Sequence, residues 1–521
     1  MPPSPSFFLA AVHFAAHALA SPSDADGCAA LSKSLRIPNA LIHSAHRLQA
    51  GGSFPAQSCG PHQQVVDANL CRVSLTVTTS STSKVSMEVW LPDKWTGRVL
   101  AVGNSGLDGC IHYDDINYGV SAGFATVGTN NGHDGGGAAF YRNPGTVEDY
   151  VSRAIHTASS VVKEASRAYY GKRHTKAYYL GCSTGGRQGF KEAQSFPDDF
   201  DGIVAGAPAI NFNSLIYWSG HFSNLLGRPG SPTFLTPAEW NLVYADVLKQ
   251  CDHLDGVVDG VLEDPHLCHY RPEALLCAAG RTNNCLTAAQ AGAVRAVFSP
   301  LRSSQGDLMC PRMQPGPNFA NIFAAQPLSY STEWFRYVVY NDPSWAPSQL
   351  SLKDWVAAER LNPFNVATRD GDLSKFQNRG GKILHYHGLE DPVISSENSI
   401  WYYDHVSRTM GLPPAKLDDF YRFFRISGLG HCAGGRGAGS IGNTKSTVAS
   451  LDPLRNVLFA MVKWVEQGVA PEVIRGTKHA NGDASSRAVA HRDHCKYPLR
   501  NVYNGHADAG DAASWKCQSS A

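Results

Sequence analysis

The feature that most constrains this chain is a serine set between glycines, where an apolar run gives way to a probable helix. Residues 176–187 read Lys-Ala-Tyr-Tyr-Leu-Gly-Cys-Ser-Thr-Gly-Gly-Arg. Gly181-x-Ser183-x-Gly185 is the pattern of a nucleophile elbow, a sharp strand-to-helix turn that holds a serine hydroxyl at the edge of a sheet. The glycines let the strand and the helix pack closely around the turn. Because a pattern this short also occurs by chance, the residues around it must show whether the serine is catalytic.

Apolar runs before and after the serine predict the strands of one sheet. They lie at 73–79, 85–91, 99–102, 202–208, 382–388 and 420–426. Between them, 146–170 has apolar residues at helical spacing, and we expect a long helix with Thr146 and Asp149 as its capping box and Gly171 as its stop. Strand, helix and strand in succession predict a parallel sheet, so the expected fold class is α/β, with an α/β-hydrolase fold.

A serine nucleophile needs a base and a carboxylate that orients the base, and this fold supplies them in the order Ser, Asp, His. Asp391 follows the strand predicted at 382–388, and we prefer it to Glu390 because it lies further into the turn. His431 lies 40 residues later in a glycine-rich loop after another predicted strand. The predicted catalytic residues are therefore Ser183, Asp391 and His431. His385 and His387 are interpreted as structural groups of the sheet.

Two further features belong to the same site. The oxyanion formed on attack needs two donors, which we expect to be the backbone N–H of Thr184 and one from the Ser105-Gly106 turn, assigned to Gly106. Cys182 precedes the serine and Cys432 follows the histidine. If the serine and the histidine touch, these cysteines lie close enough to form a disulfide that joins nucleophile to base.

Composition and the N-terminus favour an exported protein. Residues 1–20 contain an apolar run and end in Ala-Leu-Ala before Ser21, which is typical of a signal peptide. The chain has 13 cysteines, more than a reducing compartment would usually hold, and one of them must be left over. With 45 basic and 44 acidic residues and no long single-sign run, neither a nucleic-acid partner nor a membrane partner is expected.

The chain changes character after the strand predicted at 202–208. Residues 209–364 gain tryptophans and lose the rhythm of short β runs, so we interpret them as an inserted lid, with 21–208 and 365–521 forming the catalytic domain. Within the lid, five carboxylates lie between positions 252 and 264. Hard oxygen ligands at this density suit Ca²⁺. The predicted calcium ligands are the side chains of Asp252, Asp255 and Asp259 with the carbonyls of Val257 and Val261, although an acidic surface turn would explain the residues as well.

Together these motifs resemble the tannase and feruloyl esterase family of secreted α/β-hydrolases. The resemblance rests on Cys-Ser-x-Gly-Gly at 182–186, on Asp391, on His431-Cys432 and on the acidic loop at 252–261. It implies the Cys182–Cys432 bridge, a structural Ca²⁺ ion in the lid, and five more disulfides: Cys28–Cys71, Cys59–Cys110, Cys251–Cys268, Cys277–Cys285 and Cys495–Cys517. Cys310 remains unpaired in this scheme.

The resemblance also implies a substrate class. We expect a phenolic ester of a plant cell-wall polysaccharide, with the elbow sequence favouring a feruloyl esterase of the fungal B type. A tannase that cleaves galloyl esters is the second interpretation. A non-catalytic binding module that kept the fold is a third, from another class of protein.

Overall fold

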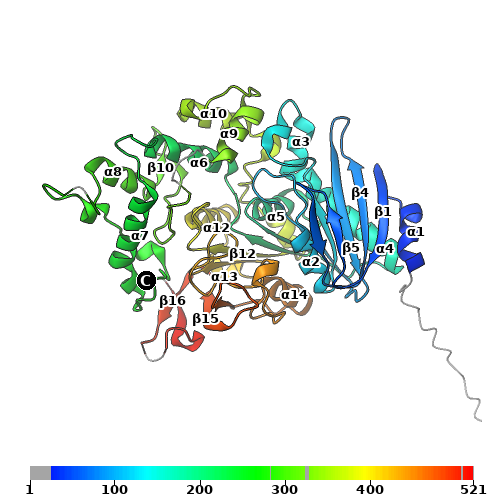
Figure 1. Ribbon diagram of the computed structural model, residues 1–521. Coiled ribbons are helices and arrows are strands. Elements are labelled where there is room, and N and C mark those ends of the chain that lie inside the picture. The colour runs from blue at the N-terminus through cyan, green and yellow to red at the C-terminus, as the bar shows by residue number, and fades with distance from the viewer. Residues whose placement is uncertain (1–24, 282, 323–327, 506–507, 520–521) are drawn as a thin grey trace, which may run out of the picture.

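The computed structural model describes residues 25–281, 283–322, 328–505 and 508–519. The predicted signal peptide therefore lies outside the described residues. A nine-stranded sheet forms the centre of the molecule (Figure 1). In spatial order its strands are β1 (Ala40–Leu48), β4 (Leu70–Thr78), β5 (Lys84–Pro92), β7 (Ala125–Thr129), β6 (Arg98–Val102), β8 (Lys176–Cys182), β9 (Gly202–Gly206), β12 (Lys382–Gly388) and β13 (Tyr421–Ile426).

The sheet is antiparallel at its N-terminal edge and parallel across the rest. β1, β4, β5 and β7 pair antiparallel, whereas β7, β6, β8, β9, β12 and β13 run parallel to one another. The parallel sheet predicted from the sequence is confirmed. Because parallel strands end at the same edge, the loops after β6, β8, β12 and β13 can meet there.

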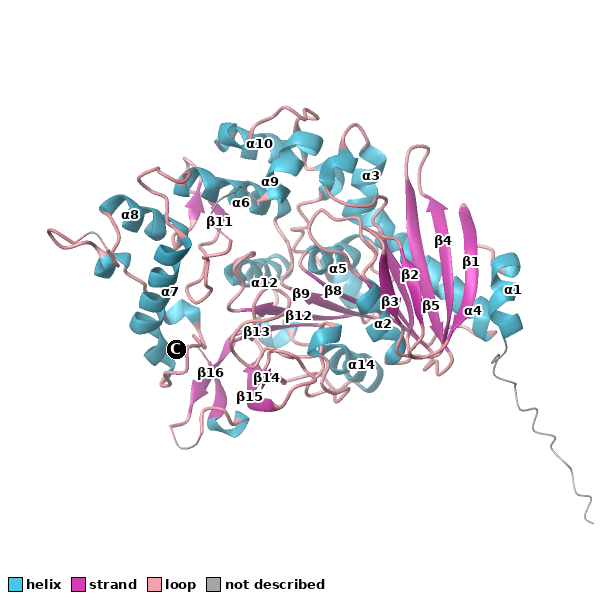
Figure 2. Ribbon diagram, viewed as in Figure 1, coloured by secondary structure: helices cyan, strands magenta, loops and turns pink. Residues whose placement is uncertain are grey.

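Helices cover both faces of the sheet (Figure 2). One hydrophobic core joins the sheet to α1 (Ala25–Ser34), α4 (Ala154–Tyr170), α5 (Thr184–Ser195) and α12 (Ser396–Met410). A second core joins the opposite face to α2 (Tyr113–Ser121) and α14 (Val457–Gln467). None of the helices in the described part of the chain is long and apolar enough to cross a bilayer.

The predicted helix at 146–170 is present, but its start differs from the expectation. It runs through α3 (Pro144–Glu148), a π-helical turn at Asp149–Arg153 and α4, and it stops at Gly171, whose φ is +68°. The capping box of Thr146 with Asp149 is wrong. Asn143 caps the helix instead, since its side chain accepts the N–H of Thr146, and Pro144 at the first position favours the earlier start.

Most of the remaining helices lie between β9 and β12, in the region predicted as a lid. They pack around a separate hydrophobic core that includes Trp218, Trp240 and Trp334. The elements of this region include α6 (Phe212–Leu226), α7 (Pro237–Cys251), the 3-10 turn η3 (Asp252–Asp255), α8 (Ala288–Val297), β10 (Leu301–Arg302), β11 (Leu308–Cys310), α9 (Ser329–Trp334), the π turn η6 (Phe335–Val339) and α10 (Leu352–Leu361). α11 (Ser374–Asn378) lies between the predicted lid and β12.

Small hairpins and one short helix complete the chain. β2 (Ser53–Ala56) pairs with β3 (His62–Val65), and α13 (Pro414–Leu417) precedes β13. In the C-terminal part, β14 (Val473–His479) pairs with β15 (Ala488–Cys495), and β16 (Leu499–Tyr503) pairs with β17 (Trp515–Ser519).

Candidate active site

Ser183 lies in a tight turn between β8 and α5. Its φ is +64°, a conformation that costs a non-glycine residue about 1–3 kcal/mol and persists only where its surroundings hold it. Here the N–H of Ser183 donates to the carbonyl of Gly206 at 3.0 Å, and the N–H of Ala209 donates to the carbonyl of Ser183 at 3.1 Å. A Cβ at position 181 would lie 2.7 Å from the carbonyl oxygen of Gly185, so glycine is required there. The segment forms the strand, turn and helix that the pattern predicts.

The structure brings the three predicted catalytic side chains together. His431 Nε2 lies 3.0 Å from Ser183 Oγ, and His431 Nδ1 lies 2.7 Å from Asp391 Oδ2. Since a carboxylate only accepts, Nδ1 carries the proton and Nε2 is free to accept from the serine hydroxyl. Glu390, the alternative acid, turns away and pairs with Arg436 at 3.0 Å. The three groups therefore form one hydrogen-bonded relay across the loops after β8, β12 and β13.

Burial and neighbouring charges shift the pKa values of both ionisable residues of this relay, Asp391 and His431. Burial alone would raise the pKa of Asp391, but the charge and hydrogen bonds of His431 and His387 outweigh burial and hold that pKa below its ordinary value. The other oxygen, Oδ1, accepts the N–H groups of Val393 and Ile394 at 2.8 and 2.9 Å. Burial lowers the pKa of His431, but the charge and hydrogen bond of Asp391 raise it by more, so it lies above its ordinary value. The acid stays ionised and makes the imidazole a stronger base.

A buried chain of hydrogen bonds continues behind Asp391, and sequence reasoning missed its link to the site. His387 Nε2 lies 3.1 Å from Asp391 Oδ2, and His387 Nδ1 lies 2.6 Å from Ser399 Oγ. Ser399 Oγ lies 2.8 Å from His385 Nε2, and His385 Nδ1 lies 2.9 Å from the hydroxyl of Tyr421. With one proton on each ring, every group is satisfied if Tyr421 donates to His385, His385 to Ser399, Ser399 to His387, and His387 to Asp391.

The sequence did contain a signal for this chain of hydrogen bonds. His385 and His387 lie two residues apart on β12, and side chains two residues apart share a face of a strand. His387 also lies only four residues before Asp391. The interpretation of both rings as structural groups of the sheet is incomplete, because His387 directly contacts the carboxylate of the relay.

The disulfide predicted next to the relay is present. Cys182 and Cys432 are bonded, with their Cα atoms 5.9 Å apart. The five pairs implied by the family resemblance also form: Cys28–Cys71, Cys59–Cys110, Cys251–Cys268, Cys277–Cys285 and Cys495–Cys517. Cys310 is a buried free thiol, as expected, and burial raises its pKa well above the ordinary value.

Both residues predicted to supply the oxyanion donors line one pocket with Ser183. Thr184 begins α5, and the N–H groups in the first turn of a helix have no acceptor within the helix. The carbonyl of Gly106 accepts from Thr184 Oγ1 at 2.6 Å and from the hydroxyl of Tyr150 at 2.9 Å, which fixes this turn against the elbow. Gly106 has a φ of +50°, and a Cβ there would lie 2.8 Å from the ring of Tyr330.

The pocket beside Ser183 is lined mainly by apolar side chains from α6 and from the loops at the sheet edge. We call it the apolar pocket. Its lining residues are Gly106, Leu107, Ser183, Thr184, Ala209, Phe212, Leu215, Ile216, Ser219, Leu328, Tyr330, Val393 and Ile394. The pocket is small, about 40 Å³, so it admits only part of an aromatic or aliphatic group next to the serine hydroxyl.

The predicted calcium loop follows α7 and is enclosed by the Cys251–Cys268 disulfide. Backbone N–H groups of the loop donate to its three aspartates: Gly260 to Asp252 at 3.0 Å, Val257 to Asp255 at 3.0 Å, and Val261 to Asp259 at 3.1 Å. These bonds hold each carboxylate against the backbone of the loop. Among the described residues, the group that places three such ligand atoms within 4.8 Å of one another is His156, Glu192 and Asp199, so the structure does not bring the three aspartates together as a ligand cluster.

The electrostatics of this loop fit a cation. Burial raises the pKa of Asp255 to about 7, and the neighbouring charges of Glu263 and Asp259 add to the shift. Burial also raises the pKa of Asp252. Asp259 lies 3.7 Å from Arg492, but neither Asp252 nor Asp255 forms an ion pair with any residue that the structure describes. Of these carboxylates Asp252 is buried, Asp255 is half-buried and Asp259 is exposed. Carboxylates short of positive charge are donors that suit Ca²⁺.

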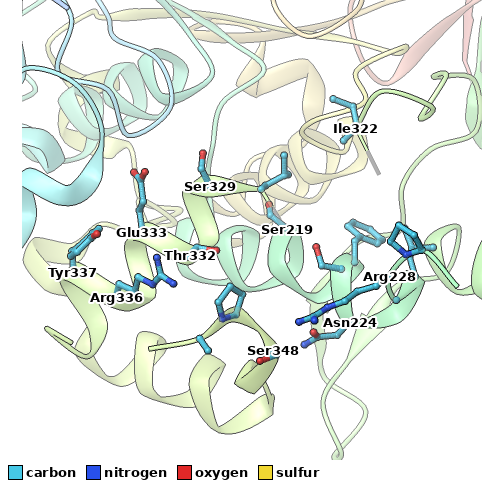
Figure 3. A pocket seen from close by; sticks show the side chains of 18 residues that line it. Ser219, Asn224, Arg228, Ile322, Ser329, Thr332, Glu333, Arg336, Tyr337 and Ser348 are labelled. Carbon is cyan, nitrogen blue, oxygen red and sulfur yellow. The ribbon is translucent and has the colours of Figure 1, made fainter. Parts of the chain in front are cut away.

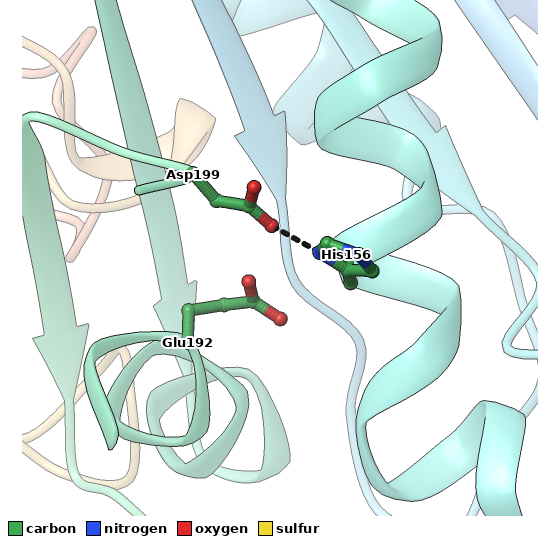
Figure 4. A group of neighbouring side chains, drawn as sticks. All are labelled: His156, Glu192 and Asp199. Carbon is green, nitrogen blue, oxygen red and sulfur yellow. Dashed lines mark hydrogen bonds and ion pairs between the residues drawn. The ribbon is translucent and has the colours of Figure 1, made fainter. Parts of the chain in front are cut away.

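A separate group of metal-ligating side chains lies at the far end of α5 from Ser183. His156, Glu192 and Asp199 place one ligand atom each within 4.8 Å of one another (Figure 4). His156 Nδ1 lies 2.6 Å from Asp199 Oδ2, whereas neither oxygen of Glu192 has a hydrogen-bond partner in the described part of the chain. Burial raises the pKa of Glu192 well above its ordinary value. This group could hold a metal ion, and no sequence pattern pointed to it.

A largely parallel sheet with a serine elbow after β8, an acid after β12 and a histidine after β13 is the α/β-hydrolase fold. Comparison with known proteins assigns the chain to one family within this class. The sequence model of the family described as "Tannase and feruloyl esterase" matches residues 69–335 and 339–518. The chain belongs to the tannase and feruloyl esterase family.

Individual relatives agree with this assignment. A probable feruloyl esterase B-2 from Aspergillus terreus is 48% identical over 499 residues, which cover 94% of each chain. The crystal structure of feruloyl esterase B from Aspergillus oryzae is 45% identical, with a TM-score of 0.92 over 95% of this chain and 100% of that one. A tannin acyl hydrolase from Aspergillus niger shares the fold, with a TM-score of 0.73 and 23% identity over 95% of each chain.

Proposed function

We propose that this chain is a secreted carboxylic ester hydrolase that cleaves feruloyl and other hydroxycinnamoyl esters of plant cell-wall polysaccharides. The single observation that carries the proposal is the hydrogen-bonded relay of Ser183, His431 and Asp391 at the mouth of an apolar pocket. The high identity to relatives named as feruloyl esterases supports the choice of acyl group.

The geometry suggests an acyl-enzyme mechanism. Ser183 Oγ attacks the ester carbonyl while its proton passes to His431 Nε2, and Asp391 stays ionised beside the imidazolium. The backbone N–H groups of Thr184 and Gly106 stabilise the oxyanion. His431 then gives its proton to the leaving alcohol, which breaks the C–O bond and leaves the acyl group on the serine. A water molecule then gives a proton to His431 Nε2 and attacks the acyl carbon. The proton returns to Ser183 Oγ as the acyl–serine bond breaks, and the free acid leaves.

The apolar pocket is the proposed acyl site. Phe212, Leu215 and Ile216 would contact a hydroxycinnamoyl ring once their side chains make room for it, since the pocket of about 40 Å³ is smaller than the ring. A galloyl ring carries three hydroxyl groups, and each of them would lose its water partners in such a pocket. This lining favours a feruloyl over a galloyl ester, so tannase activity is the second candidate.

The lid and its metal complete the proposal. We take 209–364 as the lid, because α6 and the segment at 328–330 supply much of the acyl pocket. Ca²⁺ would be held by Asp252, Asp255 and Asp259 with the carbonyls of 257 and 261. The ion would neutralise carboxylates of the loop and stabilise the lid. The six disulfides and the leader predicted at 1–20 support secretion.

Two assays test the proposed function. A fluorophosphonate probe should label the wild-type protein but not Ser183→Ala, and absence of labelling on the wild type would favour a binding module over an enzyme. Methyl esters of ferulic, caffeic, p-coumaric and gallic acids should then be compared at equal enzyme concentration. The proposal requires higher kcat/KM for the hydroxycinnamates, whereas a preference for methyl gallate would make the protein a tannase.

A further inference from the structure

Glu192 differs from the other buried glutamates that the structure describes. Those three each pair with an arginine: Glu88, Glu263 and Glu390. Even Glu333, which lines a hollow between α6 and α9, accepts the N–H of Gly137 at 2.7 Å (Figure 3). Glu192 is only 1% exposed, and neither of its oxygens has a hydrogen-bond partner among the described residues. A buried carboxylate is stable only if it carries a proton or meets a positive charge.

The side chain of Glu192 points toward a pair formed by two further ligand groups (Figure 4). His156 Nδ1 lies 2.6 Å from Asp199 Oδ2, and the three residues place one ligand atom each within 4.8 Å of one another. Asp199 is buried like Glu192, whereas 42% of the His156 side chain is exposed. The two acids therefore lie inside the protein, and the imidazole offers an ion a path from solvent.

One stripe of α4 holds the other two ligand groups in place. Residues 156, 159 and 163 follow the spacing i, i+3, i+7, which puts them on one face of the helix. Ser159 Oγ and Lys163 Nζ donate to the main-chain carbonyl of Asp199 at 3.4 and 2.6 Å. The ring of His156 stacks on Phe196, with the ring centroids 4.1 Å apart. The imidazole and the Asp199 carboxylate are thus positioned by contacts other than their bond to each other.

The charges in this group favour a cation. Glu192 and Asp199 are both acids, and no lysine or arginine of the described residues forms an ion pair with either of them. Lys163 brings one positive charge nearby, but it binds the carbonyl of Asp199 and not a carboxylate. Two buried negative charges against one positive charge attract a further cation. The metal-free alternative is a proton on Glu192, donated to Asp199.

The donor atoms select the kind of metal. An imidazole nitrogen with carboxylate oxygens is a ligand set of Zn²⁺, whereas Ca²⁺ takes six to eight oxygens. Zinc bonds of about 2.1 Å place tetrahedral ligand atoms about 3.4 Å apart. An ion would therefore part His156 from Asp199 slightly and draw Glu192 inward. Glu192 breaks no hydrogen bond by this movement.

We infer that His156, Glu192 and Asp199 form a zinc site that links α5 to α4. Water would take the fourth position, on the exposed side next to the imidazole. Glu192 lies eight residues after Thr184 on α5, a rise of about 12 Å, so the ion would stabilise the helix behind the elbow and not touch the reacting atoms. This inference does not depend on the proposed function, and the site is distinct from the acidic loop at 252–261.

Zinc binding by the full chain tests the inference. Metal is removed with a chelator, Ca²⁺ is restored in excess so that it occupies the acidic loop, and ZnCl₂ is titrated by calorimetry. The wild type should bind one Zn²⁺ at least about 100-fold more tightly than Glu192→Gln or His156→Ala. A 100-fold excess of Zn²⁺ over Kd should raise the Tm of the wild type by about 2–3 °C and leave that of Glu192→Gln unchanged.

Glu164→Gln is the matched control, because it removes a surface carboxylate from the same helix as His156. It should bind Zn²⁺ as the wild type does. Equal Zn²⁺ binding by all four proteins would mean binding to other surface groups and would overturn the inference. A wild type that binds no Zn²⁺ would also overturn it and favour the proton on Glu192. Should His156→Ala not fold, Glu192→Gln decides, since glutamine keeps the volume and can donate to Asp199.

Discussion

Removing the Cys182–Cys432 disulfide should damage catalysis more than any other disulfide removal in this chain. The bond joins the residue before Ser183 to the residue after His431. Ser183 and Cys432 both have positive φ values, +64° and +62°, so one strained position is the nucleophile itself and the other directly follows the base. Without the bond, each loop can relax its own strain, and the hydroxyl and the imidazole can move apart.

The magnitudes follow from loop length and from geometry. Closing a loop of 250 residues stabilises the folded state by about 5.5 kcal/mol on the chain-entropy model, against about 2.5 kcal/mol for the 8-residue loop of Cys277–Cys285. A shift of about 1 Å between reacting groups costs about 100-fold in rate. We therefore expect kcat/KM for methyl ferulate to fall by about 100-fold or more in the Cys182→Ala/Cys432→Ala variant.

The assay pairs this variant with Cys277→Ala/Cys285→Ala, which removes a disulfide of the lid region. Free energies of unfolding come from urea titration, and kcat/KM is measured under conditions where both variants remain folded. The control should lose stability and keep kcat/KM within about threefold of the wild type, because its loop does not touch the relay. The reasoning is refuted if the active-site variant, still folded, retains wild-type kcat/KM, or if both variants lose activity to the same extent.

Three other predictions test the site and the loop. Asp391→Asn should lower kcat by about 10⁴-fold, because an amide neither fixes the tautomer of His431 nor stabilises the imidazolium. Activity requires neutral His431 and is lost as the pH falls through the raised pKa of this residue. Because Asp391→Asn removes the carboxylate that raises this pKa, the acid limb of the kcat/KM profile should move to lower pH. An acid limb that stays in place would contradict this. Ser399→Ala should lower the free energy of unfolding by about 2–4 kcal/mol and reduce kcat, because it leaves one buried ring nitrogen of His385 and one of His387 unpaired. The control, Ser396→Ala on the same helix, should change neither the free energy of unfolding nor kcat. Chelating calcium should lower the free energy of unfolding by about 3 kcal/mol relative to protein in a 100-fold excess over Kd, with initial rates unchanged; metal-free protein of equal stability would dispose of the calcium loop.

The part of the site that could be predicted depends on residues that are close together in the sequence. A serine elbow depends on glycines two or three residues away, where backbone packing leaves no room for a Cβ, so its pattern can be seen in a segment of twelve residues. The order of the acid and the histidine follows from the direction of a parallel sheet. The disulfide partner of Cys182 could be inferred because each cysteine is adjacent in sequence to one half of the relay.

Other features depend on contacts that no local pattern records. The helix at 144–170 begins at Pro144 under an Asn143 cap, although Thr146 and Asp149 fit a capping box in the letters alone. The contact of His387 with Asp391 depends on how the turn after β12 folds back on its own strand. The meeting of His156, Glu192 and Asp199 depends on the packing of α4 against α5.

By itself, the sequence determined the class of fold, the nucleophile, the order of its partners and the disulfide between them, since each rests on spacing along the chain or on the alternation of strands and helices. Only the tertiary structure decided what surrounds them. The apolar pocket and the hydrogen-bonded chain from Tyr421 to Asp391 each combine side chains from several elements, and their shapes come from side-chain packing, which residue order alone does not specify.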